Sequence, residues 1–246
     1  IYRARGVKSS EELELSLSQL QHSETIKGLD EAVNLLLDAL FNKRKILIVG
    51  DFDCDGATST TLIMLVLKAL KVDCQFLVPN RFEYGYGLTP EIVDLASKEN
   101  PYLIVTVDNG ISSIDGVKRA KQLGIKVLIT DHHLPGDELP DADAIVNLNQ
   151  AGCEFKSKSA AGVGVIFYVL SGLRAKLREL GWFEDQGIPE LNMASYLDVL
   201  ALGTVADLVP LDMNNRILVE QGLRRIRAGK CRPGIKALLK QAGKNV

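Results

Sequence analysis

Short apolar runs rich in β-branched residues recur along the first two thirds of the chain, and none of them alternates apolar with polar positions. They cover residues 46–49, 103–107 and 127–130. Unbroken runs of this length are typical of strands that are buried on both faces of a parallel sheet. The segments that separate them have helical patterns, at 57–71, 89–99 and 112–123. Strands that alternate with helices predict an α/β fold, with a parallel sheet flanked by helices.

The pattern divides the chain into three parts. Residues 1–44 form a charge-rich helical lead-in, in which Ser9–Glu12 resembles a capped helix start. Residues 45–212 form the main domain, in which the sheet ends near Asn149 and a mostly helical portion follows. Residues 213–246 are predicted to be a helical extension that leads toward a further domain.

Three aspartates follow the first apolar run, at Asp51, Asp53 and Asp55. In an extended chain, residues two apart point to the same side. If the strand geometry continues, the three carboxylates face one way and repel one another unless a cation neutralises them. The alternative is a solvated acidic turn closed by Gly56, which is common after strands.

Acidic and imidazole groups also follow the other two runs. Asp108 ends the second run, and Asp131, His132 and His133 end the third. Ligands of doubly wound sheets bind beyond the carboxyl ends of the strands, so these side chains are expected to converge on one crevice. Carboxylate oxygen and neutral imidazole suit Mn²⁺, Mg²⁺ or Zn²⁺, and the absence of cysteine-rich zinc spacing favours Mn²⁺ or Mg²⁺.

Asp207 lies in a mostly apolar segment, Gly203–Asp207, after a helical pattern over residues 191–202. A carboxylate in such surroundings needs a partner to remain ionised. That partner is either the same cation site, a helix end or a downstream arginine.

Composition limits the classes of function. The chain has 246 residues, 46% of them hydrophobic, and a net charge of −2. It can bury a substantial core, but it lacks the basic footprint of many nucleic-acid-binding modules, so contacts with nucleic acid must be local. It has no run that could span a membrane and no secretory signal, and its four cysteines lack metal-ligand spacing, so we expect a cytoplasmic protein with reduced thiols.

The motifs together resemble those of the DHH phosphoesterase superfamily. The run Asp51–Gly56, the strand end Val107–Gly110, Asp131–His133 and Gly203–Asp207 have the order and rough spacing of its four motifs. Further segments resemble its single-strand-specific exonuclease branch, over a region from about residue 29 to the end: 79–81, 85–88, 133–136 and 208–211. The chain departs from this branch at Asn147-Leu148-Asn149, where the branch often has Asn-Pro, which puts only the rigidity of that loop in doubt.

The resemblance implies a pair of Mn²⁺ or Mg²⁺ ions. The ligands that it implies are Asp53, Asp55, Asp108, His132 and Asp207. Asp51 and His133 are assigned to catalysis. Asp51 is a less secure metal ligand than the five residues above. His133 is expected to contact the scissile phosphate, and the alternative is that it orients other groups of the site.

Substrate contacts are expected around the same crevice. Small residues from Ser159 to Gly164 lead into an apolar helix, so Gly162 is a candidate for an amide contact with phosphate, although close packing of helix on sheet explains it equally well. The other candidates are basic, aromatic or amide side chains that suit phosphates and stacked bases: Arg81, Lys156, Lys158, Tyr86 and Asn109.

The function implied by the resemblance is a two-metal phosphodiesterase, a 5′-to-3′ exonuclease that degrades single-stranded DNA to mononucleotides in repair and recombination. The expected partner is single-stranded DNA, with no membrane, a monomeric state, and a helicase or single-strand-binding protein as further partners. The chain is expected to be a fragment that lacks a DHH-associated domain and an oligonucleotide-binding domain. Two alternatives remain: a phosphodiesterase for short oligonucleotides or cyclic dinucleotides, and a non-hydrolytic nucleotide-binding module. Against the second alternative, the chain lacks the Gly-x-Gly-x-x-Gly turn that such a module would have after its first strand.

Overall fold

A five-stranded parallel sheet forms the centre of the chain. The computed structural model describes residue 7, residues 9–10 and residues 13–244. The strands lie in the order β2-β1-β3-β4-β5, and every neighbouring pair is parallel. Their bounds are β1 Ile46–Gly50, β2 Cys74–Leu77, β3 Leu103–Val107, β4 Lys126–Asp131 and β5 Ala144–Asn147.

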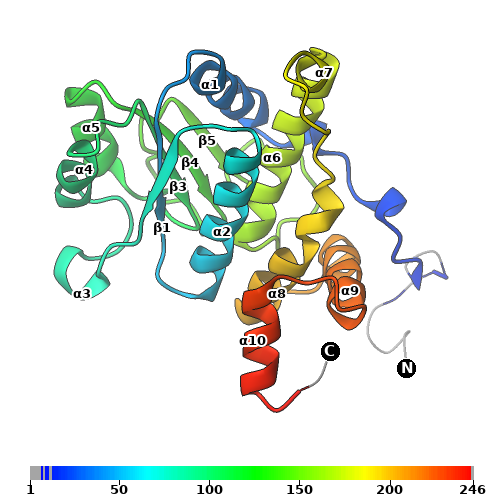
Figure 1. Ribbon diagram of the computed structural model, residues 1–246. Helices are drawn as coiled ribbons and strands as arrows, with labels where there is room; N and C mark the ends of the chain where they lie inside the picture. Colours follow the sequence, from blue (N-terminus) through cyan, green and yellow to red (C-terminus); the bar gives the residue numbers. More distant parts are fainter. Residues whose placement is uncertain (1–6, 8, 11–12, 245–246) are drawn as a thin grey trace.

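Helices cover both faces of this sheet (Figure 1). Helices α4 and α5 cover one face, while α1, α2 and α6 cover the other; α8, α9 and α10 continue beyond α2 and α6. The helices are α1 Leu29–Phe41, α2 Cys54–Ala69, α3 Arg81–Tyr84, α4 Pro90–Ser97, α5 Ile114–Gln122, α6 Gly162–Glu179, α7 Trp182–Asp185, α8 Leu197–Ala206, α9 Met213–Arg227 and α10 Pro233–Gln241. Short 3₁₀ turns occur at η3 Leu17–Gln19, η4 Ser23–Thr25 and η5 Met193–Tyr196.

Each buried strand contributes to two cores. In β1, Ile46 and Ile48 pack with α1, α2 and α6, whereas Leu47 and Val49 pack with α4 and α5. Successive side chains of a strand point to opposite faces, so a strand covered on both faces must be apolar throughout. This explains why the apolar runs identify β1, β3 and β4. It also explains why the edge strand β2, which is only partly buried, gave no comparable signal.

The register of the sheet brings the carboxyl ends of the central strands level with one another. Gly50 pairs with Val107, and Val107 pairs with Thr130. The residues that follow these positions therefore emerge side by side. The strand order also reverses between β1 and β3, because the chain passes from β1 outward to β2 and then returns to β3 on the other side. Doubly wound sheets bind their ligands at such a switch point.

The α/β prediction is confirmed, including the helical C-terminal part. The expected capped start at Ser9–Glu12 extends into residues 11–12, which lie outside the described residues. The division at residues 44 and 212 stays a prediction. Every helix of the described chain is too short or too polar to cross a membrane.

Candidate metal centre

The acidic run after β1 turns directly into helix α2. Strand β1 ends at Gly50, and Asp53 is the N-cap of α2, where its Oδ1 accepts the Gly56 N–H at 2.9 Å. Aspartate is favoured at this position because its carboxylate satisfies an unpaired amide of the first helical turn. The expectation that the strand geometry continues through Asp55 is therefore wrong. The carboxylates of Asp51 and Asp53 still approach one another, but Asp55 points into the protein from the first turn of α2.

Asp55 is held by the first residues of helix α6. The residue is 1% exposed; Oδ2 accepts the Gly162 N–H at 2.5 Å, and Oδ1 accepts the Val163 N–H at 2.9 Å. A helix N-terminus stabilises an anion through its free amides and its dipole. The amide of Gly162 is thus directed at a carboxylate of the protein, and the expectation that it contacts substrate phosphate is corrected.

Gly162 also allows α6 to approach the end of β3. A Cβ atom at Gly162 would lie 2.7 Å from the Asp108 Cβ and 2.8 Å from its Oδ1. Asp108 itself has a φ of 62°, a left-handed conformation that aspartate tolerates better than most residues. Gly162 therefore allows the close packing of helix on sheet that the sequence offered as the alternative to a phosphate contact.

His132 lies at the centre of the buried carboxylates. Its Nε2 atom is 3.1 Å from Asp108 Oδ1, 3.6 Å from Asp207 Oδ2 and 3.8 Å from Asp55 Oδ2. Asp207 is the C-cap residue of α8, so the helix that was expected to precede its motif in fact includes Gly203–Ala206. Five sequence-predicted ligands thus come from four different elements or their ends: Asp53, Asp55, Asp108, His132 and Asp207.

Two atoms of this cluster have unused bonding capacity. Asp108 Oδ1 and His132 Nε2 are buried, and neither makes a hydrogen bond within the described part of the chain. Buried polar atoms are ordinarily paired, so such atoms call for a ligand. Three groups among the described residues place their ligand atoms within 4.8 Å of one another: Asp51, Asp53 and Asp108; Asp55, His132 and Asp207; and Asp108, His132 and His133. The donors are oxygen and imidazole nitrogen, which fit Mn²⁺ or Mg²⁺.

The electrostatics of the cluster also favour a cation. Burial raises the pKa of Asp108 to about 8, and burial likewise raises the pKa of Asp55 to about 6. Burial alone would lower the pKa of His132, but contact with Asp108 and the charges of Asp55 and Asp207 outweigh it and raise that pKa to about 9. Burial also raises the pKa of Asp207. A divalent cation reverses this balance because it stabilises the ionised carboxylates.

A pH dependence follows for protein treated with a chelator. The pKa values of Asp108 and His132 are both raised, so the folded protein retains protons at this pair that the unfolded chain releases near its ordinary pKa values of 3.8 and 6.5. A raised pKa contributes stability at low pH that is lost as pH rises through the folded value. We therefore expect the free energy of unfolding to fall by at least about 1 kcal/mol between about pH 6 and pH 9.

Chemical denaturation across this pH range measures the effect. Saturating Mn²⁺ should flatten or reverse the dependence, since the cation competes with these protons. A chelated protein whose stability rises steadily over the same range would contradict the assignment.

The loop that carries both histidines is organised by a residue to which the sequence assigned no role. Asp131 Oδ1 accepts the backbone N–H groups of His132 at 2.7 Å and His133 at 3.1 Å, and it contacts His133 Nδ1 at 2.7 Å. Its Oδ2 accepts the Ile111 N–H at 2.9 Å. Burial would raise the pKa of Asp131, but these hydrogen bonds prevail and lower it. Asp131 in turn raises the pKa of His133.

Two asparagines after β5 complete this loop. Asn147 Nδ2 donates to the His133 carbonyl at 2.9 Å, and Asn149 Nδ2 donates to the His132 carbonyl at 2.6 Å. The Asn149 N–H also donates to Asn147 Oδ1 at 2.8 Å. The two asparagines that flank Leu148, which stands at the expected proline position, therefore hold the histidine loop by hydrogen bonds. The signal in the sequence was an Asn-x-Asn segment at the carboxyl end of a strand beside β4.

Arg81 and Tyr86 lie at the rim of the cluster, as a substrate-contacting role requires. Arg81 pairs with Asp51, and its guanidinium stacks on Tyr86. The Tyr86 hydroxyl lies 3.3 Å from His133 Nδ1, and burial raises the pKa of this phenol. His133 is 47% exposed on its side chain and faces the same rim.

Two other predicted substrate residues have structural contacts. Asn109 is 2% exposed, and its Nδ2 donates to the carbonyls of Val49 at 3.1 Å and Val107 at 2.9 Å, which ties β1 to β3. Lys158 Nζ donates to the carbonyls of Leu148 and Cys153, each at 2.7 Å. The expected contact of the buried Asn109 with substrate is corrected for this reason, whereas the contact of the exposed Lys158 with phosphate stays a prediction. Lys156 is exposed, and its contact with phosphate stays a prediction.

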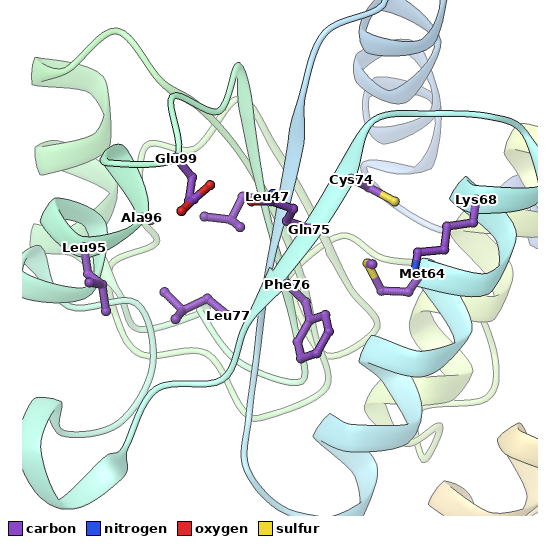
Figure 2. Close-up of a pocket in the computed structure, with 10 residues that line it drawn as sticks. All are labelled: Leu47, Met64, Lys68, Cys74, Gln75, Phe76, Leu77, Leu95, Ala96 and Glu99. Atoms are coloured by element: carbon purple, nitrogen blue, oxygen red, sulfur yellow. The ribbon is translucent and has the colours of Figure 1, made fainter. Parts of the chain in front are cut away.

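A cavity of about 560 Å³ opens beside this rim and has Tyr86, Ser113, Asp131 and His133 in its wall. A second cavity, of about 370 Å³, lies against the edge strand β2 (Figure 2). Its wall consists largely of apolar side chains such as Leu47 and Phe76, and it contains none of the candidate ligands. The chemistry therefore belongs to the first cavity and the carboxylate cluster beside it.

Comparison with known proteins agrees with this geometry. The chain is 59% identical over 240 residues to the single-stranded-DNA-specific exonuclease RecJ of Salmonella typhimurium, and 55% identical over 246 residues to RecJ of Escherichia coli. These alignments cover 97% and 100% of the chain but 42% and 43% of the relatives. The chain thus spans about two fifths of the length of the relatives that it matches.

Solved structures share the fold of the chain. A crystal structure of exonuclease RecJ bound to manganese matches with a TM-score of 0.75 and 36% identity, covering 89% of this chain and 52% of that one. RecJ of Thermus thermophilus in complex with Mn²⁺ matches with a TM-score of 0.77 and 32% identity, covering 99% of this chain and 33% of that one. The DHH family model for the N-terminal domain matches residues 45–204. The resemblance predicted from the motifs is confirmed, and the chain belongs to the DHH family.

Proposed function

We propose that this chain is the catalytic part of a divalent-metal-dependent phosphodiesterase that acts on single-stranded DNA. The observation that carries the proposal is the cluster around His132, in which buried ligand atoms without hydrogen bonds face one another at the carboxyl ends of β1, β3 and β4. The RecJ relatives are named as single-stranded-DNA-specific exonucleases, and related structures contain Mn²⁺ or Mg²⁺. These comparisons support the substrate and the metal.

The proposed ligands divide between two groups. Asp51, Asp53 and Asp108 would hold one ion; Asp55, His132 and Asp207 would hold the other, with Asp108 close to both. When bound, a pair of divalent ions supplies an activated water and neutralises charge on the oxygens of a phosphodiester. This chemistry requires no nucleophile from the protein, so hydrolysis by water is the reaction that we propose.

The remaining roles fall to residues at the rim. His133 is exposed, and Asp131 holds its Nδ1 at 2.7 Å, so its Nε2 can face a substrate phosphate. A protonated imidazole there would stabilise developing charge or donate a proton to the leaving oxygen. Tyr86 and Arg81 would contact the base and the phosphate of the same strand. The 5′-to-3′ direction, the release of mononucleotides in repair and recombination, and a helicase or single-strand-binding partner extend this proposal by similarity.

A degradation assay tests the proposal. The chain should release labelled nucleotides from single-stranded DNA in Mn²⁺ or Mg²⁺, and EDTA should abolish the release. Matched duplex DNA should resist. Substrates labelled at the 5′ or the 3′ end measure the direction, because a 5′-to-3′ enzyme releases the 5′ label first. Degradation that persists in EDTA, or that is faster on duplex DNA, would contradict the proposal.

A further inference from the structure

Asp51 is bound by an arginine from a distant part of the chain. Arg81 Nη2 lies 2.9 Å from Asp51 Oδ1 and 2.6 Å from its Oδ2. Oδ1 also accepts the Phe52 N–H at 2.7 Å. The Asp51 side chain is 10% exposed and that of Arg81 is 40% exposed, so water screens this ion pair only from the arginine side. Most of the hydrogen-bonding capacity of the carboxylate is therefore already used.

The arginine is held in place by two aromatic rings. Its guanidinium carbon lies 4.2 Å from the ring centroid of Phe52 and 4.9 Å from that of Tyr86. Both distances are within the range of a cation–π interaction. Tyr86 in turn contacts His133. Arg81 thus lies between the carboxylate cluster and the rim where a substrate phosphate would bind.

The same carboxylate belongs to a potential cation site. Asp51, Asp53 and Asp108 place their ligand atoms within 4.8 Å of one another. A divalent ion in this group would lie beside the guanidinium, and like charges at short distance repel. We propose that Arg81 is a positioning residue that competes with a divalent cation for Asp51, and that a phosphate which attracts Arg81 frees this carboxylate for the cation.

Thermodynamic linkage makes the effect reciprocal. If phosphate binding removes Arg81 from Asp51, phosphate must raise cation affinity by the same factor by which the cation raises phosphate affinity. The cation would then bind most tightly when substrate is present. The phosphate half of this inference rests on the proposed function, whereas the competition for Asp51 rests only on the observed contacts.

Titration with Mn²⁺ alone tests the competition, by calorimetry or by electron paramagnetic resonance of free Mn²⁺. Arg81→Ala should tighten the weaker Mn²⁺ site about three- to tenfold, because an unfavourable charge and a competing partner are both removed. Arg81→Lys should fall between this variant and the wild type. Arg119→Ala is the matched control: Arg119 also pairs with an aspartate, Asp94, and its side chain is 38% exposed against 40% for Arg81.

A double-mutant cycle separates competition from altered folding. Asp51→Asn should weaken the same site, and adding Arg81→Ala to Asp51→Asn should tighten Mn²⁺ binding by a smaller factor than in the wild type, because only the unfavourable charge is then removed. Unchanged or weaker Mn²⁺ binding in Arg81→Ala, with an unaltered thermal unfolding curve, would overturn the proposal. So would equal tightening by Arg81→Ala in the presence and absence of the Asp51 carboxylate.

Thymidine 5′-monophosphate tests the phosphate half, because it has no phosphodiester to cleave. It should tighten Mn²⁺ binding to the wild type and have a smaller effect on Arg81→Ala. Because the nucleotide binds Mn²⁺ directly to the same extent in both titrations, the comparison of the two proteins also corrects for that binding. If Arg81→Ala tightens Mn²⁺ binding but the nucleotide acts equally on both proteins, the coupling to phosphate is overturned while the competition stands. That result differs from failure of the proposed function, which the degradation assay reports.

Discussion

Asp108→Asn should reduce turnover on single-stranded DNA by at least about 10³-fold, equivalent to about 4 kcal/mol in the activation free energy. Asp108 belongs to two of the three potential cation groups, and its Oδ1 is 3.1 Å from His132 Nε2. The amide keeps the size of the side chain but removes the charge that would hold a cation. Mn²⁺ affinity should therefore fall together with turnover.

The same substitution should stabilise the chelated protein. Burial raises the pKa of Asp108 to about 8, so near and above that pH the folded state bears the cost of an ionised carboxylate beside other carboxylates. We expect the free energy of unfolding at pH 8 in EDTA to rise by about 1 kcal/mol, and the pH dependence between 6 and 9 to become shallower.

Asp94→Asn provides the control, because Asp94 is an exposed residue of α4 whose partner is Arg119. It should change turnover little and stability by less than about 1 kcal/mol. Near-normal turnover of Asp108→Asn at saturating Mn²⁺ would remove this residue from the proposed metal centre.

The position of the site could be predicted from the sequence, because it depends on local pattern. Strands buried on both faces must be apolar, so the boundaries of β1, β3 and β4 are visible as the points where Asp51, Asp108 and Asp131 interrupt apolar runs. Parallel strands place their carboxyl ends at one edge, so these side chains had to converge. Neither inference needs any knowledge of long-range contacts.

The supporting contacts could not be predicted in the same way, because they join residues that are far apart in the chain. Asp55 receives the amide of Gly162 from 107 residues away, and Asp51 receives Arg81 from 30 residues away. The sequence shows that Gly162 is small and that Arg81 is basic, and both facts suit a substrate contact as well as they suit an internal one. For Gly162, only the packing of α6 on the end of β3 decides between a substrate contact and an internal contact.

Asn147 and Asn149 illustrate a related limit. Their side chains hold the backbone carbonyls of His133 and His132, and the backbone has no sequence signature that would indicate a partner. Hydrogen bonds from side chain to backbone are common in proteins, and they are chosen by loop geometry rather than by residue pattern. The Asn-x-Asn segment therefore suggested only a less rigid loop, whereas it fixes the loop that presents both histidines.

Gly162→Ala should lower both the stability of the protein and its affinity for Mn²⁺. The added Cβ would lie 2.7 Å from the Asp108 Cβ, so the start of α6 must move away from the end of β3. That movement would lengthen the hydrogen bonds that the Gly162 and Val163 amides donate to Asp55. Overpacking of this kind costs about 1–3 kcal/mol. Because Gly162 is the first residue of α6, helix propensity alone would favour alanine by up to about 1 kcal/mol, so the sign of the change separates the two effects.

Gly234→Ala in α10 is the matched control, because its added Cβ would meet no atom within 4 Å. It should leave Mn²⁺ affinity unchanged and keep or slightly raise the free energy of unfolding. Urea denaturation in EDTA measures stability without the metal, and Mn²⁺ titration of the same variants measures the site. If Gly162→Ala behaved like Gly234→Ala in both experiments, α6 would not need close contact with β3, and its amides would not be what holds Asp55 in the metal centre.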